Sequence, residues 1–172
     1  MSNIGEKARL LGSNAKEAAL VDQWVQFAEN ELGGPTGNII QLIFGPPGNF
    51  HREVRTKGFH ISARHLMRAV QILDQNVERL GRALTYLESY LATRSTDYVA
   101  SDTLSLADLV LVGVVFSARR VSLGTAEVAQ YPNVFAHFTK VIEDERVKQF
   151  WGVEGWPFVD VAITEPRQFP LP

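Results

Sequence analysis

The sequence predicts an all-α fold, a single helical bundle, and three observations support that class. Apolar residues recur at steps of three and four in several segments, which is the periodicity of one helix face. No paired strand pattern and no internal repeat stands out. The chain of 172 residues has the size of one ordinary domain with a buried core. We therefore expect residues 1–172 to form one domain.

Composition excludes several classes of function. Lys and Arg number 17 against 19 Asp and Glu, a formal net charge of -2, so neither nucleic acid nor an anionic membrane is an expected partner. The absence of cysteine excludes a disulfide scaffold, a thiolate zinc site and a cysteine nucleophile. No apolar run is long enough to span a bilayer, and the amino terminus lacks the apolar core of a secretory signal. These features favour a cytoplasmic protein.

The first helix is predicted over residues 15–32. Its apolar positions, Leu20, Trp24, Phe27 and Ala28, lie at three- and four-residue steps and give the helix an aromatic inner face. Gly33, Gly34 and Pro35 follow directly, and this combination predicts the end of the helix.

Residues 36–60 are expected to form a largely irregular loop, because they contain several Gly and Pro residues, including the pair Pro46-Pro47. The loop is nevertheless apolar: it carries Ile39, Ile40, Leu42, Ile43, Phe44, Phe50 and Phe59. Long apolar loops in compact domains more often have a function or are covered by a partner than have no role.

A long helix of about 30 residues gives the clearest signal in the chain. Its apolar residues recur at alternating steps of four and three: Leu66, Val70, Leu73, Val77, Leu80, Leu84, Leu87 and Leu91. A seam of this kind is compatible with a coiled coil, but other helical patterns flank it, so the helix is interpreted as the spine of a bundle. Ser62 is the expected cap at its start.

The stretch "DTLSLADLVLVGVVF", residues 102–116, places an acid at the start of an apolar run. Ser105 as the cap makes Asp108 the third helical residue, which is the spacing of a capping box. Leu104 and Leu109 occupy the positions of a hydrophobic staple. These local contacts account for Asp108, so a structural role is preferred over a catalytic one. The helix that follows has no polar face and is expected to be enclosed by its neighbours.

A last helix is predicted from Pro132, which suits a first helical turn. His137 is expected to be a surface or half-buried packing residue. The acids Glu143, Asp144 and Glu145 precede basic residues and are interpreted as a solvated helix boundary, and a further short helix is expected through Trp151. The tail, rich in Pro and Gly, is expected to pack back on the bundle.

The order of these elements resembles the carboxy-terminal, all-helical domain of the cytosolic glutathione transferases. The stretches that carry the likeness are "ARLLGSNAKEAALVDQWVQFAENEL", "TLSLADLVLVGVVF" and "YPNVFAHFTKVIEDERVKQFWG". Within that superfamily the resemblance is strongest to the transferase-like domain of translation elongation factor one gamma. With the long helix, it covers nearly the whole chain.

The resemblance also marks differences. A glutathione transferase begins with a thioredoxin-like half that holds glutathione, and this half is expected to be absent from residues 1–172. The chain also resembles small free-standing transferase-like isomerases such as that of the fungal pseurotin pathway. That likeness implies glutathione as a cofactor and a trans-to-cis rearrangement of a polyketide olefin.

In a transferase, the first helix and the loop after it lie where the hydrophobic acceptor binds. The resemblance therefore implies these substrate-binding candidates: Trp24, Phe27, Phe44, Phe50, His51 and Phe59. The same surface is equally suited to an interface, covered by a missing half, by a second copy in a homodimer or by a helical partner subunit. No catalytic residue is identified. His51, His60 and His65 are too loosely spaced for a metal motif, and no metal site is predicted.

Arg119 and Arg120 suit a carboxylate such as that of glutathione, but as cations near a helix end they are equally well explained by the helix dipole. Two functions remain open. The preferred one is a small enzyme of secondary metabolism that isomerises or conjugates an unsaturated hydrophobic substrate with glutathione. The alternative is a non-catalytic assembly module of the translation elongation factor one complex.

Overall fold

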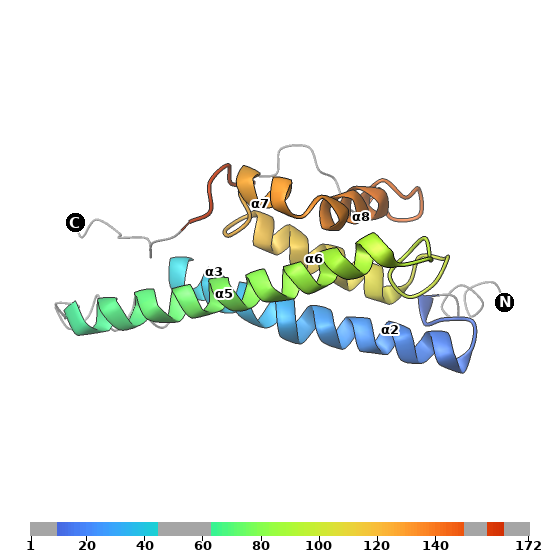
Figure 1. The fold of residues 1–172 in the computed structure, drawn as a ribbon, viewed down its shortest axis with the longest axis horizontal. Coiled ribbons are helices and arrows are strands. Elements are labelled where there is room, and N and C mark those ends of the chain that lie inside the picture. Colours follow the sequence, from blue (N-terminus) through green and yellow to red (C-terminus); the bar gives the residue numbers. More distant parts are fainter. Residues whose placement is uncertain (1–9, 45–62, 150–157, 164–172) are drawn as a thin grey trace.

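A computed structural model describes residues 10–44, 63–149 and 158–163, and in these residues it contains helices and no strand (Figure 1). The elements in chain order are α2 Ala15–Phe27, η1 Ala28–Gly33, α3 Gly34–Phe44, α5 Ala63–Thr93, α6 Leu106–Arg119, α7 Thr125–Gln130 and α8 Pro132–Ile142. The predicted all-α class is confirmed. None of the described helices is both long and apolar enough to cross a membrane.

The helices form a bundle around α5, which runs the length of the molecule (Figure 1). The continuous segment α2–η1–α3 lies along one side of α5 and runs antiparallel to it, while α7 and α8 lie on the other side. Helix α6 passes through the interior, where Ala107, Leu111, Val112, Val115 and Ala118 are buried. The prediction that α6 is enclosed by its neighbours is therefore confirmed.

The expected end of the first helix at Gly33–Pro35 is wrong. The chain passes through the π-helical segment η1, in which the N–H of Gly34 donates to the carbonyl of Glu29, and continues as α3. Pro35 falls in the first turn of α3, where a missing N–H is tolerated, and the wider π turn accommodates the ring that would otherwise break the helix. Residues 36–44, expected to be part of an irregular loop, are therefore helical, and residues 45–60 of that expected loop lie outside the described residues.

Helix α5 confirms the predicted long helix, and most of its leucine seam is buried, including Leu73, Leu80, Leu84 and Leu87. Val77 departs from the seam, because 44% of it is exposed. The neighbouring Asn76 is buried instead, and its Oδ1 accepts a hydrogen bond from Asn38 Nδ2 of α3 at 3.0 Å. Asn76, and not Val77, therefore lies on the face of α5 that packs against α3.

Helix α8 begins at Pro132, as predicted, but its cap comes from α5. The carboxylate of Glu88 accepts from the N–H of Asn133 at 3.0 Å and from the N–H of Val134 at 2.9 Å. A carboxylate at this position satisfies two of the orphan N–H groups and complements the positive end of the helix dipole.

Replacing Glu88 by glutamine is expected to lower the free energy of unfolding by about 1 kcal/mol, since the two N–H groups of α8 lose a charged acceptor. Urea denaturation would measure the loss. Glu78→Gln is the matched control on the same helix, because Glu78 pairs with Arg82 and both side chains are exposed. Its effect should stay within about 0.5 kcal/mol. Equal effects of the two substitutions would contradict the capping role of Glu88.

The chain after α8 differs in part from the expectation. Residues 143–149 form turns, with the N–H of Lys148 donating to the carbonyl of Asp144 at 2.8 Å, and the expected helix through Trp151 is not seen up to residue 149. The described tail does pack on the bundle, since the N–H of Val159 donates to the carbonyl of Arg119 at 3.1 Å. Gly124 permits this approach: a Cβ there would lie 2.5 Å from the carbonyl oxygen of Asp160.

Candidate functional site

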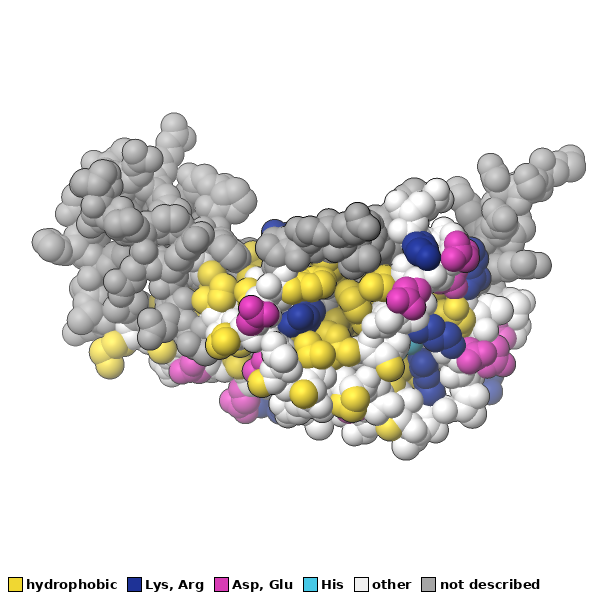
Figure 2. Space-filling view, turned by 90° about the horizontal axis from the view of Figure 1, so that it is seen from above, with side chains coloured by type: hydrophobic (Ala, Val, Ile, Leu, Met, Phe, Trp, Pro, Cys, Tyr) yellow, Lys and Arg dark blue, Asp and Glu magenta, His cyan; other side chains and the backbone are white. Residues whose placement is uncertain are grey.

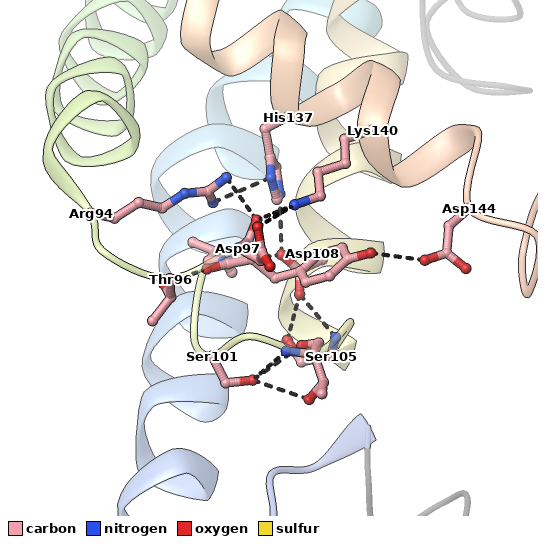
Figure 3. A network of polar contacts seen from close by, with 12 residues as sticks. Arg94, Thr96, Asp97, Ser101, Ser105, Asp108, His137, Lys140 and Asp144 are labelled. Atoms are coloured by element: carbon pink, nitrogen blue, oxygen red, sulfur yellow. Dashed lines mark hydrogen bonds and ion pairs between the residues drawn. The ribbon is translucent and has the colours of Figure 1, made fainter.

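A buried polar network surrounds the start of α6 (Figure 3). Ser105 is extended and precedes the helix, and Asp108 is the third helical residue. One carboxylate oxygen of Asp108, Oδ2, accepts from the N–H of Ser105 at 2.9 Å and from the Ser105 hydroxyl at 2.7 Å. The structure therefore confirms the predicted capping box.

The second oxygen of Asp108 has partners that local sequence does not reveal. Oδ1 accepts from the N–H of Val99 at 2.9 Å and lies 3.1 Å from Nε2 of His137. The Asp108 side chain is fully buried and the His137 side chain is only 2% exposed. The expectation that His137 is a surface or half-buried residue is wrong, because α8 turns this side chain into the bundle against α6.

The network reaches the surface through Arg94 at the end of α5. Its Nη1 lies 3.3 Å from Nδ1 of His137, and its Nη2 donates to the carbonyl of Asp97 at 3.0 Å. Figure 3 shows His137 between Arg94 and Asp108. We call Arg94, His137 and Asp108 the Arg–His–Asp series.

The electrostatics of Asp108 favour the anion. Burial raises the pKa of this carboxyl, but the 3.1 Å contact with His137 and the hydrogen bonds from Val99 and Ser105 together lower it below its ordinary value. A carboxylate that is fully buried and held as the anion has no proton to donate and no exposed face. The arrangement is therefore suited to fixing the fold, as predicted, and not to acid–base chemistry on a substrate.

Tyr98 forms a second polar contact beside this network. Its hydroxyl donates to Oδ2 of Asp144 at 2.9 Å, and Lys140 Nζ lies 4.6 Å from the centre of its ring. The Arg146 guanidinium beside Asp144 holds the pKa of that carboxyl well below its usual range. Asp144 is thus more than part of a solvated helix boundary, because it ties residue 98 to the end of α8.

An aromatic cluster lies between α2 and α5. It consists of Trp24 and Phe27 from α2, and Tyr86 and Tyr90 from α5. The ring centres of Trp24 lie 5.2 Å from Phe27 and 4.4 Å from Tyr90, and those of Phe27 and Tyr86 are 5.4 Å apart. Trp24 is buried, whereas 54% of Tyr86 is exposed. The cluster therefore extends from the core to the surface.

The backbone of Val99 joins the two features. Its carbonyl accepts from the Tyr90 hydroxyl at 2.8 Å, and its N–H donates to Asp108. Residues 94–104, the connection between α5 and α6, are thus held to the aromatic cluster on one side and to the buried carboxylate on the other. We call these residues the α5–α6 loop.

The structure brings together only some of the substrate-binding candidates. Trp24 and Phe27 are neighbours in the aromatic cluster. Phe44 ends α3, 17 residues beyond Phe27, or roughly 25 Å along the helical path. Phe50, His51 and Phe59 lie outside the described residues.

The sequence analysis missed Tyr86 and Tyr90. Their four-residue spacing beside the leucine seam was the available signal, since residues four apart share a helix face.

Arg119, a candidate to bind a carboxylate of glutathione, instead contacts other groups of this chain. Its Nη1 donates to the carbonyls of Leu123 and Val159, and its guanidinium lies 4.9 Å from the centre of the Phe158 ring. On the face seen from above, hydrophobic side chains surround a basic side chain near the middle, whereas the basic side chains on the right lie beside acidic ones (Figure 2). Within the described ranges no group of three metal-ligating side chains occurs; His51 and His60 lie outside them.

The all-α bundle, with a buried central helix that opens in a capping box, has the fold class of the glutathione transferase carboxy-terminal domains. Residues 71–152 match the family model described as glutathione S-transferase, C-terminal domain. The fold is thus similar to that of the glutathione S-transferase C-terminal domain, as the resemblance implied.

Known proteins support this assignment. A glutathione S-transferase-like protein of Aspergillus aculeatus is 27% identical over 144 residues, which cover 83% of this chain and 58% of that protein. The chain therefore spans less than two thirds of the length of this curated relative.

Two solved structures share the fold. The GST-like domain of elongation factor 1-gamma from Saccharomyces cerevisiae superposes with a TM-score of 0.73 at 20% identity, covering 96% of this chain and 66% of that one. Glutathione S-transferase-I bound with lactoylglutathione superposes with a TM-score of 0.60 at 26% identity, covering 85% and 62% of the two chains.

Proposed function

We propose that this chain is the part of a glutathione-transferase-like protein that binds a hydrophobic, unsaturated small molecule, and that glutathione is the second substrate. The observation that carries the proposal is the aromatic cluster, in which an exposed Tyr86 and a half-buried Phe27 lie against a buried Trp24. Stacked and edge-on rings are suited to flat, conjugated ligands. The matches to glutathione S-transferase-like proteins support glutathione as the thiol.

The reaction that we propose is trans-to-cis isomerisation, with conjugation as its variant. The thiolate of glutathione adds to an electron-poor alkene, the former double bond rotates as a single bond, and elimination of the same thiolate restores the alkene. No atom is gained or lost. If the adduct takes up a proton instead of eliminating, the product is the conjugate.

The described residues contribute shape and orientation, not proton transfer. Asp108 and His137 are enclosed by protein, and Arg119 is engaged by backbone carbonyls. The other proposed substrate contacts are Phe44, Phe50, His51 and Phe59. A place in fungal secondary metabolism and in the cytoplasm belongs to the same proposal, in accord with the fungal relatives.

Binding of a conjugated polyene tests this function. Tyr86→Ala is expected to raise the dissociation constant roughly tenfold, because the ligand loses an aromatic contact and the area it covers. Met67→Ala is the matched control, since Met67 is also exposed and also lies on α5. Equal binding by the two variants would contradict the aromatic cluster as the site.

Catalysis is tested separately. The chain is incubated with glutathione and a trans-polyene, and the olefin geometry is followed by NMR. Formation of the cis product faster than with glutathione alone is expected. No acceleration, together with normal ligand binding, would restrict the proposal to a binding function.

The second candidate function is assembly within the translation elongation factor one complex. The superposition on the elongation factor 1-gamma domain, which covers 96% of this chain, favours it. Sedimentation of the chain with the purified elongation factor subunits tests this function. A stable complex, together with no polyene binding, would replace the enzymatic proposal.

A further inference from the structure

The chain after α8 returns to the bundle with residues 158–163, which lie beside α7 (Figure 1). This segment has neither helix nor strand, and none of its residues is fully buried; Val161 is 78% exposed. The segment lies on the connection between α6 and α7, where Val121, Ser122 and Leu123 are buried. We call residues 158–163 the tail strap and residues 119–125 the docking site. The tail strap thus packs on the bundle from outside.

The backbone of the tail strap binds carbonyl groups that α6 leaves without a helical partner. The N–H of Val159 donates at 3.1 Å to the carbonyl of Arg119, the last residue of α6. The N–H of Ile163 donates at 2.8 Å to the carbonyl of Val121, just beyond the helix. The last carbonyls of any helix need acceptor partners of this kind, and water can replace a peptide there. The end of α6 is therefore suited to bind a peptide backbone reversibly.

The start of α7 binds the strap in the opposite direction. The N–H of Thr125, the first residue of α7, donates to the carbonyl of Asp160 at 2.8 Å. This approach requires glycine at position 124, because a Cβ there would lie 2.5 Å from the carbonyl oxygen of Asp160 and 2.9 Å from Cα of Val161. The backbone of Gly124 has a φ of -79°, which other residues also adopt. The glycine is thus needed for the strap and not for the turn itself.

Two side chains complete the docking. Nη1 of Arg119 donates to the carbonyl of Val159 at 3.2 Å, and its guanidinium lies 4.9 Å from the centre of the Phe158 ring. That ring also meets the Phe116 ring edge-on, with 5.4 Å between the ring centres. Burial lowers the pKa of Arg119, and the exposed carboxylate of Asp160 opposes this shift. The docking site therefore selects for an aromatic side chain as well as for a backbone.

Few contacts hold the tail strap. To described residues it makes three backbone hydrogen bonds and the one from Arg119. Its apolar anchors, Phe158 and Ile163, are only half-buried, whereas Leu111 and Val115 of α6 are 1% and 2% exposed. Segments with few buried contacts open at a lower free energy than the core of a protein. We therefore expect the strap to open before the bundle unfolds.

We propose that the docking site is a recognition site for a peptide segment, and that the tail strap occupies it as a unit that detaches while the bundle stays folded. The peptide backbone binds the ends of α6 and α7, and an aromatic side chain binds beside Arg119. The segment that fits is one like residues 158–163, with an aromatic residue first and an aliphatic residue five positions later. The closed strap blocks this surface to any other segment. Its opening requires neither glutathione nor the hydrophobic ligand.

Amide exchange of the unaltered protein tests the detachment. The amides of Thr125, Val159 and Ile163 take part in the strap contacts, so they share one opening free energy if the strap opens as a unit. Their protection factors are expected to agree within about threefold and to be at least roughly 100-fold lower than that of the Val115 amide inside α6. Protection equal to that of Val115 would overturn the proposal, as would three unrelated values.

Gly124→Ala is the most selective substitution, because the three heavy atoms nearest to the added methyl group all belong to the strap. The three strap amides are expected to exchange roughly tenfold faster, while the Val115 amide changes by less than about twofold. Gly37→Ala is the matched control, since a Cβ there would meet no neighbouring atom within 4 Å. Equal effects of the two substitutions on the strap amides would contradict the docking. A loss of protection that includes Val115 would show that strap and bundle open together, against the proposal.

A peptide of sequence FVDVAI, residues 158–163 with blocked ends, tests recognition in trans. In Phe158→Ala the strap loses its aromatic anchor, so the Thr125 amide is expected to exchange roughly tenfold faster than in the unaltered protein. The peptide at about 1 mM is expected to restore this protection, because a tethered segment has an effective concentration in the same range. The same peptide with alanine in place of phenylalanine is the control and should have no effect. No restoration by FVDVAI, or equal restoration by both peptides, would overturn the recognition site.

Discussion

Asp108→Ala is expected to lower the free energy of unfolding by about 3–5 kcal/mol, the typical cost of removing one partner from a buried charged network. The substitution leaves the buried N–H groups of Ser105 and Val99 without an acceptor and removes the carboxylate that lies 3.1 Å from Nε2 of the buried His137. It also removes the negative charge from the positive end of α6. Urea denaturation followed by circular dichroism would measure the change.

Asp102→Ala is the control for this experiment. Asp102 lies in the same loop, is exposed, and accepts only a 3.2 Å hydrogen bond from the N–H of Asp97 among the described contacts. Its loss should cost less than about 1 kcal/mol. A similar loss of unfolding free energy in the two variants would show that the buried Asp108 stabilises the fold no more than the exposed Asp102.

The same carboxylate gives the protein a defined response to acid. The pKa of Asp108 is lowered in the folded state, so its stabilising contribution is complete above the ordinary aspartate pKa of about 3.9. The contribution is lost as pH falls from there through the lower folded value. Stability should therefore decline below about pH 4, and less steeply in Asp108→Ala. Some decline remains in the variant, because the pKa of Asp144 is lowered too.

The leucine seam provides the second large effect. Leu87→Ala should lower the free energy of unfolding by about 2–5 kcal/mol, because Leu87 is completely buried and its removal leaves a cavity between helices. Val77→Ala, at another position of the same predicted seam, should cost less than about 1 kcal/mol, since 44% of Val77 is exposed. Denaturation midpoints would separate the two. Equal losses would mean that the seam is buried evenly along α5.

Features encoded within a few residues could be predicted from the sequence. The capping box needs only the spacing of Ser105 and Asp108, and the start of α8 needs only Pro132. The spine helix follows from a period that repeats over many turns. Each of these signals is local, so a single sequence is enough to recognise it.

Features that depend on contacts between distant residues could not be predicted. Arg94 and His137 are 43 residues apart, and no pattern near either one indicates the other. The burial of Asn76 in place of Val77 depends on Asn38 of another helix. The helix continues through Gly33–Pro35 because of a π turn, which is rare and which Gly and Pro residues do not indicate in a sequence.

The candidate site was predicted only in part for the same reason. The apolar pattern of the first helix indicated Trp24 and Phe27. Their partners Tyr86 and Tyr90 come from α5, and only the folded bundle shows that the four rings meet.

The position of Glu88 has a consequence for the order of folding. Its carboxylate is 45 residues upstream of the first α8 amide that it binds. An excised peptide of residues 131–142 therefore lacks the acceptor that begins its own helix, and short helices are marginal in water. We therefore expect α8 to form after α5 has presented the Glu88 side chain, so that the carboxy-terminal helix depends on the long helix for its start.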